Sequence, residues 1–101
     1  MKSIMQTDRE CCYICGGYPN FKDGMLEDHH VFFGAGRRKL SEKYGLKIYI
    51  HANKCHRNGE NAVHVNKDVR RETERAGQQA FERVHGTRED FIRIFGRNYE
   101  F

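Results

Sequence analysis

Histidines and cysteines are the residues of this sequence best suited to chemistry. It contains six histidines and four cysteines, and most of them lie before residue 67. Imidazole binds divalent cations and also exchanges protons near neutral pH. Histidines clustered between two strands and a helix could therefore supply a metal centre together with a free imidazole that deprotonates water, which is a hydrolytic arrangement. His85 stands apart near the end of a helix and is expected to be an ordinary polar side chain.

The cysteines predict a separate metal site. Cys12 and Cys15 form a C-x-x-C turn followed by two glycines, in which two thiolates can face one tetrahedral ion. The segment "HANKCH" could complete the site through His51 and Cys55, with His56 in place of His51 as the alternative. Four protein ligands leave no open position, so a zinc ion here would be structural. The other interpretation is that these cysteines are small buried hydrophobic residues.

The adjacent histidines His29 and His30 lie in a stretch, "MLEDHHVFF", whose β-branched and aromatic end suits a strand. Alternation along a strand places Glu27 and His29 on one face and Asp28 and His30 on the other. The two histidines can reach one site only where the strand ends or bulges. The glycines shortly after Phe33 favour an early strand end.

Other elements follow from periodicity and end signals. "LKIYIH" predicts a second strand, and "GAGRRKLSEKYG" predicts a loop with one helical turn at "LSEKY". Asn66 can cap a long helix that stops at Gly86, and Thr87 with Asp90 resembles a capping box for the short helix "REDFIRIF". The long helix has residues at helical spacing that predict its buried face: Val69, Thr73, Ala76, Ala80, Phe81 and Val84.

Composition predicts one α+β domain over 1–101, with a ligand-bearing part (1–66) and a helical part (67–101). Hydrophobic residues make up only 38% of the chain, so a metal ion would supplement a modest core. The net charge of +4 suits a polyanionic partner. No stretch is apolar enough for a membrane span, and we expect a cytoplasmic protein whose cysteines bind metal, with Cys11 as the spare.

These motifs in order, namely C-x-x-C, a strand ending in "DHHV", a second strand, a Cys-His pair and a helix, resemble the HNH or ββα-metal nuclease superfamily. The segments "SEKYGL" and "FGRNY" are similar to small phage and prophage HNH proteins, distantly related to recombination-enhancing nucleases that act with RecA. The resemblance covers nearly the whole chain. It implies a zinc-stabilised ββα-metal (His-Me finger) domain with an additional C-terminal helix, acting in the host-cell cytoplasm if phage-encoded.

The resemblance also implies roles for individual residues. His30 matches the general base that activates water, and His29 matches a ligand of the catalytic divalent ion. His56 and His64 resemble further ligands of that ion. The superfamily's central Asn has no clear counterpart before the second strand, so Glu42 or a backbone carbonyl would orient His30.

The chemistry implied by the resemblance is hydrolysis of DNA phosphodiester bonds with one metal ion, leaving a 5′-phosphate. The ion would be Mg²⁺ or Mn²⁺, although imidazole ligands also suit Zn²⁺ or Ni²⁺. No segment resembles a reader of base edges, so cleavage should be weakly sequence-specific or directed by a partner, such as a recombinase or another phage or host protein.

Cations beside the expected active site could contact DNA. Arg37, Arg38 and Lys39 directly follow the strand that carries His30, where they could hold phosphates or form a solvated loop. Arg70 and Arg71 near the start of the long helix are equally open to both interpretations.

Two other questions stay open at the level of sequence. The HNH-like scaffold could serve as a non-catalytic, zinc-stabilised module that binds DNA or protein, or as a factor that targets a host protein. The aromatic stripe of the C-terminal segment is expected to be core, with a dimer or partner surface as the alternative; it comprises Phe91, Ile92, Ile94, Phe95, Tyr99 and Phe101.

Overall fold

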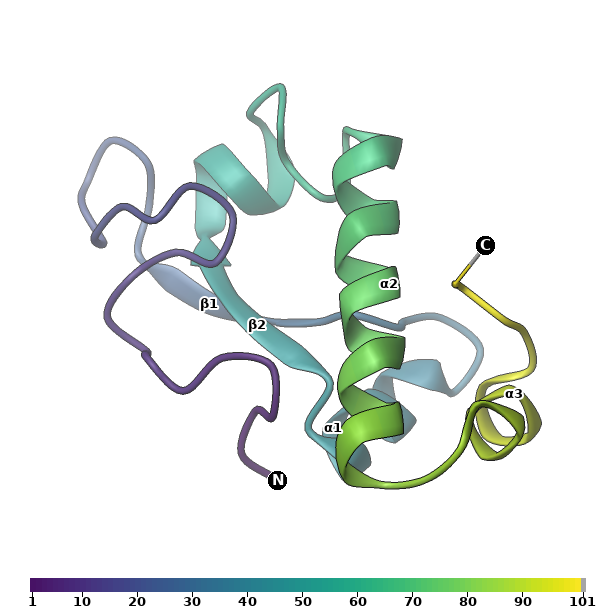
Figure 1. The fold of residues 1–101 in the computed structure, drawn as a ribbon. Helices are drawn as coiled ribbons and strands as arrows, with labels where there is room; N and C mark the ends of the chain where they lie inside the picture. The colour runs from purple at the N-terminus through teal and green to yellow at the C-terminus, as the bar shows by residue number, and fades with distance from the viewer. Residues whose placement is uncertain (101) are drawn as a thin grey trace.

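Two short antiparallel strands and four helical segments make up the regular structure of residues 1–100, which the computed structural model describes (Figure 1). The architecture is therefore α+β, as expected. The elements in chain order are β1 (Leu26–His30), α1 (Arg37–Tyr44), β2 (Lys47–His51), the π-helical turn η1 (Ala52–Arg57), α2 (Lys67–Val84) and α3 (Arg88–Phe95).

Strand β1 is shorter than the apolar run that predicts it. It pairs with β2 in a register that places His29 opposite Ile48 and His30 opposite Lys47, and it ends at His30. Ser41 provides the reason. Its hydroxyl accepts from the Phe32 amide at 3.0 Å and donates to the Phe32 carbonyl at 2.7 Å, so a side chain satisfies this backbone in place of a neighbouring strand.

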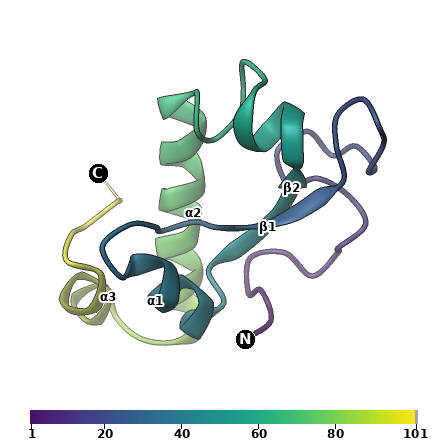
Figure 2. The same ribbon diagram turned by 180° about the vertical axis from the view of Figure 1, so that it is seen from behind.

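The segment between the strands is a helix, so the expectation of a loop with one helical turn is wrong. Gly36 precedes α1 at φ 85° and Gly45 follows it at φ 72°, both in the left-handed region that glycine adopts readily. The cations Arg37, Arg38 and Lys39 therefore lie in the first turn of α1 (seen in front in Figure 2).

The predicted capping residues of the two C-terminal helices, α2 (Lys67–Val84) and α3 (Arg88–Phe95), are confirmed. The Asn66 side chain accepts from two backbone amides at the start of α2, and Thr87 with Asp90 forms a reciprocal capping box on α3. The expected buried face of α2 is correct except at its end, where Val84 is 56% exposed.

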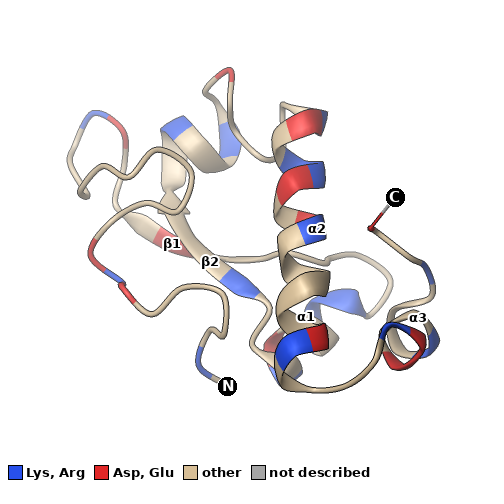
Figure 3. Cartoon of the chain, viewed as in Figure 1, with Lys and Arg blue, Asp and Glu red and all other residues tan. Residues whose placement is uncertain are grey.

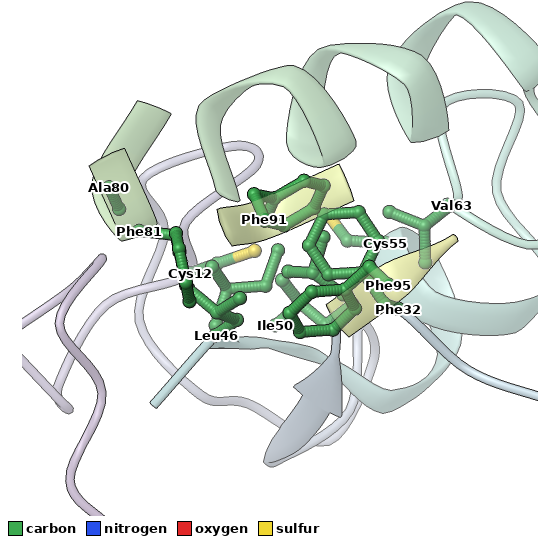
Figure 4. Packing of buried hydrophobic residues seen from close by; sticks show 12 residues of the cluster. Cys12, Phe32, Leu46, Ile50, Cys55, Val63, Ala80, Phe81, Phe91 and Phe95 are labelled. Carbon is green, nitrogen blue, oxygen red and sulfur yellow. The ribbon is translucent and has the colours of Figure 1, made fainter. Parts of the chain in front are cut away.

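The core joins both parts of the chain around aromatic rings (Figure 4). Phe32, which follows β1, packs against Phe91 and Phe95 of α3 with ring centroids 5.3 and 5.0 Å apart. Most of the aromatic stripe is therefore core, while Phe101 lies outside the described residues. Among residues 1–100 no helix is long and apolar enough to cross a membrane.

Candidate metal centres and histidine pocket

The expected Cys₃His set is brought together beside the end of β2. Cys12, Cys15, His51 and Cys55 each place one ligand atom within 4.8 Å of the others. The C-x-x-C turn is closed by a hydrogen bond of 2.8 Å from the Gly16 amide to the Cys12 carbonyl. His51 ends β2 and Cys55 lies in η1, so one sharp turn of the chain delivers the second pair of ligands.

The His51 ring has the orientation that a metal ligand needs. Its Nδ1 lies 3.4 Å from Cys15 Sγ and 3.9 Å from Cys55 Sγ. Tetrahedral zinc with ordinary bond lengths requires about 3.6 Å between such atoms. Its Nε2 donates to the Tyr18 carbonyl at 2.7 Å, which leaves the Nδ1 lone pair free for a cation. The cluster could therefore hold a structural metal ion such as zinc, and it uses His51 rather than His56.

Full ionisation of the clustered thiols would depend on a bound cation. Burial raises the pKa of Cys55, and the neighbouring Cys12 thiol raises it further. Burial also opposes ionisation of Cys12, but backbone amides around its sulfur, first that of Cys15, bring its pKa below the usual value. Several thiolates in so small a volume require a cation to balance their charge. Cys11 points elsewhere, with its Sγ 3.3 Å from Asp8.

Three histidines from separate segments form a second cluster. His29, His56 and His64 place ligand atoms within 4.8 Å of one another, and their ring centroids are 4.8 to 5.3 Å apart. They come from β1, from η1 and from the loop before α2. A hydrogen bond from the His64 amide to the His56 carbonyl ties the two later segments together.

His29 supplies the observation that points to a ligand. Among the described residues, its Nε2 is the one buried side-chain nitrogen or oxygen without a hydrogen-bond partner. Burial lowers the pKa of His29 to about 3, and the nearby imidazoles of His56, His64 and His30 add to the effect. The ring is therefore neutral at physiological pH. A buried, neutral, unpartnered imidazole nitrogen fits a divalent cation.

Glu27, for which sequence patterns predict no role at the site, orients His56. His56 Nδ1 lies 2.7 Å from Glu27 Oε1, and Arg57 donates to the same oxygen at 2.6 Å. The hydrogen bond from His56, followed by that from Arg57, lowers the pKa of Glu27, so the carboxylate is ionised. This contact leaves His56 Nε2 for a metal ion. Glu27 and His29 share one face of β1, as alternation predicts.

His30 contacts Glu42 rather than a backbone carbonyl. Its Nε2 lies 2.8 Å from Glu42 Oε1, and Lys47 Nζ lies 3.1 Å from both oxygens of that carboxylate. The amino group of Met1, then His30, then Lys47 lower the pKa of Glu42 to about 2. Glu42 is therefore ionised and accepts from the Nε2 hydrogen of His30, which leaves Nδ1 able to take a proton.

One open cavity of about 300 Å³ joins these groups. The three clustered histidines and His30 line it together with Asp28, Phe33 and Arg38. The adjacent residues His29 and His30 reach the same cavity because β1 ends there. We call this the histidine pocket.

The three consecutive cations do not act as one block. Arg38 lines the histidine pocket. Arg37 turns toward α3, where its Nε donates to the Phe95 carbonyl at 3.2 Å. Lys39 is exposed on α1 and is not part of the pocket lining. Of the expected DNA contacts, the geometry therefore places only Arg38 beside the histidines.

A second group of cations could be predicted only in part from the sequence. Arg70 and Arg71 line another cavity, together with Lys67 and Arg97. Lys67 precedes Arg70 and Arg71 by three and four residues, so helical spacing alone predicts that it lies beside them. Arg97 is far away in the sequence, and only tertiary packing brings it to this cavity.

Comparison of the chain with protein-family models, with curated proteins and with solved structures finds no match.

Proposed function

We propose that this chain is a divalent-metal-dependent DNA endonuclease or nickase of the HNH (ββα-metal) type, which hydrolyses phosphodiester bonds. The observation that carries the proposal is the pairing of His30 with Glu42 at the edge of a pocket that also holds three converging imidazoles. A potential general base thus lies beside a potential metal site, which is the arrangement that metal-assisted hydrolysis requires.

His30 is the general base in this proposal. Glu42 holds the imidazole through Nε2, so Nδ1 accepts the proton of the attacking water. The ionised carboxylate then stabilises the positive charge that the ring acquires. Lys47 also holds Glu42, with its Nζ 3.1 Å from the same oxygen that His30 contacts.

His29, His56 and His64 would hold the catalytic ion. When bound, a divalent cation stabilises negative charge on the phosphate and on the departing 3′ oxygen. Glu27 orients His56, and burial keeps His29 neutral and ready to bind. Mg²⁺ or Mn²⁺ is the expected ion in the cell, and Zn²⁺ or Ni²⁺ suits three imidazoles in a purified sample.

Arg38 is placed to bind a phosphate of the substrate at the rim of the histidine pocket. In this proposal its guanidinium binds the backbone rather than base edges, so cutting would depend weakly on sequence. A recombinase or another phage or host protein would then direct the enzyme to its substrate.

A second candidate function is a non-catalytic, zinc-stabilised module that binds DNA or protein. Three imidazoles without a carboxylate ligand suit zinc better than Mg²⁺, and this donor set favours the alternative. The two candidates differ in whether DNA is cut.

Nicking of supercoiled plasmid DNA under Mg²⁺, Mn²⁺ or Zn²⁺ tests the proposal. His30→Ala should slow nicking by about 10²- to 10⁴-fold, the usual contribution of a positioned base. His85→Ala is the matched control, because His85 bonds the Tyr44 carbonyl at 2.8 Å and lies outside the pocket lining. Nicking by His30→Ala at the wild-type rate would remove His30 as the base. Absence of nicking with every ion, while DNA still binds, would support the non-catalytic module.

A further inference from the structure

A second cavity, of about 370 Å³, lies between the N-terminal half of α2 and the segment after α3. We call it the basic cavity. Among residues 1–100, five cations line it, namely Lys67, Arg70, Arg71, Arg75 and Arg97, and Glu74 is the single carboxylate of the lining. Figure 3 shows basic residues on the upper half of α2 and on the C-terminal segment that faces it.

The cations of α2 occupy an electrostatically unfavourable position. Lys67, Arg70 and Arg71 lie within the first five residues of the helix, where the helix dipole is positive and where anions are preferred. Like charges three and four residues apart also repel. Within the described part of the chain, no carboxylate lies at ion-pair distance from these three side chains. A negatively charged ligand would relieve this repulsion, so the arrangement indicates binding rather than stability.

The chemistry of the lining selects phosphate groups rather than bases. Tyr99 is the aromatic residue of the cavity, but the Arg97 guanidinium lies 4.7 Å over its ring, and Phe32 packs 4.8 Å away by ring centroids. The ring is therefore already in contact and is not a free platform for base stacking. Clustered guanidinium groups bind phosphate oxygens through charge-assisted hydrogen bonds.

The basic cavity lies next to the histidine pocket. Lys67 follows His64 by three residues, so their Cα atoms are at most about 11 Å apart. The two cavities are therefore close enough for one bound DNA backbone to contact both.

We propose that the basic cavity binds backbone phosphates of DNA near the bond held at the histidine pocket, and so positions the substrate independently of its sequence. The inference rests on the proposed endonuclease function, because it takes DNA as the ligand. Lys67, Arg70 and Arg71 supply the contacts from α2, and Arg97 supplies one from the opposite wall.

Salt-dependent binding of a fluorescent 20-base-pair duplex tests this site. All variants are made in a His30→Ala background, so that the duplex stays intact without removal of metal. Each lost phosphate contact should reduce the slope of log affinity against log salt by about 0.9. The double variant Lys67→Gln with Arg71→Gln should therefore reduce the slope by about 1.8. The matched control carries Lys43→Gln and Arg83→Gln, which remove the same charge from exposed positions outside the basic cavity.

Thermal unfolding separates binding from folding. Because the substituted cations oppose the helix dipole, the double variant should keep or raise the melting temperature. A slope equal to that of the control variant would overturn the inference, even if the wild-type chain nicks plasmid DNA. A reduced slope in a chain that cuts no DNA would support the basic cavity and remove the proposed catalysis.

Inorganic phosphate distinguishes a nucleic-acid site from a site for a small anion. Calorimetric titration should show no saturable binding of phosphate in the micromolar range, since the cavity is open to several phosphates at once. Tight binding of free phosphate that the double variant abolishes would overturn the assignment to the DNA backbone.

Discussion

His30 Nε2 and Glu42 Oε1 lie 2.8 Å apart, although twelve residues separate them in the chain. The contact exists because β1 ends at His30 and the chain then returns through α1, which carries Glu42 back toward the strand. Lys47, opposite His30 in the β1–β2 register, contacts the same carboxylate. One end of the strand pair thus assembles an imidazole, a carboxylate and an ammonium group.

Glu42→Gln should slow nicking without unfolding the chain. The amide keeps the size of the side chain but removes the charge that stabilises a protonated His30. A hydrogen bond to a charged group contributes about 1.5–3 kcal/mol, which corresponds to about 10- to 100-fold in rate. The comparison is nicking under saturating Mn²⁺, with Glu89→Gln on the exposed surface of α3 as the control. Equal rates for both variants would show that Glu42 does not support the base.

Removal of metal should affect the two clusters differently. Structural zinc contributes about 10–16 kcal/mol of apparent free energy in zinc-finger peptides, as much as the total stability of a typical domain. We therefore expect a strong chelator to unfold the chain, as followed by circular dichroism. Cys12→Ala should reproduce this loss. His64→Ala removes an exposed ligand from the other cluster, so it should lose catalytic metal, measured by elemental analysis, and keep the fold.

Gly77→Ala should destabilise the protein despite the higher helix propensity of alanine. An added Cβ would lie 3.0 Å from Phe32 Cε2 and 3.3 Å from Val31 Cγ1. Phe32 cannot easily shift, because aromatic rings of α3 hold it on the other side. Overpacking of this kind costs about 1–3 kcal/mol, against a gain of about 1 kcal/mol from propensity. Urea unfolding measures the difference, and Arg83→Ala, at an exposed position of the same helix, should be nearly neutral.

Local signals predicted helices α2 and α3 and the residues of the cysteine cluster. The capping residues Asn66, Thr87 and Asp90 form hydrogen bonds with backbone amides two or three residues away. Their effect can therefore be predicted from the local sequence. The C-x-x-C turn and the His51–Cys55 spacing likewise bring ligands together over short stretches of chain. Burial of the aromatic stripe also follows from its periodicity.

Features that depend on distant contacts were missed or left open. The early end of β1 depends on Ser41, and the orientation of His30 depends on how α1 returns Glu42 to the strand. The predicted helical turn is shorter than helix α1, because glycines rather than polar capping residues stand at both ends of the helix. The basic cavity required Arg97 to lie opposite α2, and no local pattern indicates that placement.

Glu74→Gln should stabilise the protein near neutral pH. Burial raises the pKa of Glu74 above its usual 4.5, against the opposing effect of Arg70 and other nearby arginines. The folded state therefore holds the proton more tightly than the unfolded chain, and this stability is lost as the pH rises from 4.5 through the raised pKa. Glutamine has no charge to bury. The gain in free energy of unfolding should consequently be larger at pH 7 than at pH 5 in urea titrations, and a gain that is equal at both values would contradict this reasoning.

The same substitution should strengthen DNA binding. Of the described residues that line the basic cavity, Glu74 alone has a carboxylate, and its charge repels a phosphate bound there. One unit charge about 7 Å from a phosphate in water contributes about 0.6 kcal/mol, or roughly a 3-fold change in affinity. Fluorescence anisotropy in the His30→Ala background measures the change, with Glu89→Gln as the control of equal charge. Weaker binding by the Glu74→Gln variant would instead show that the carboxylate positions the arginines for their ligand.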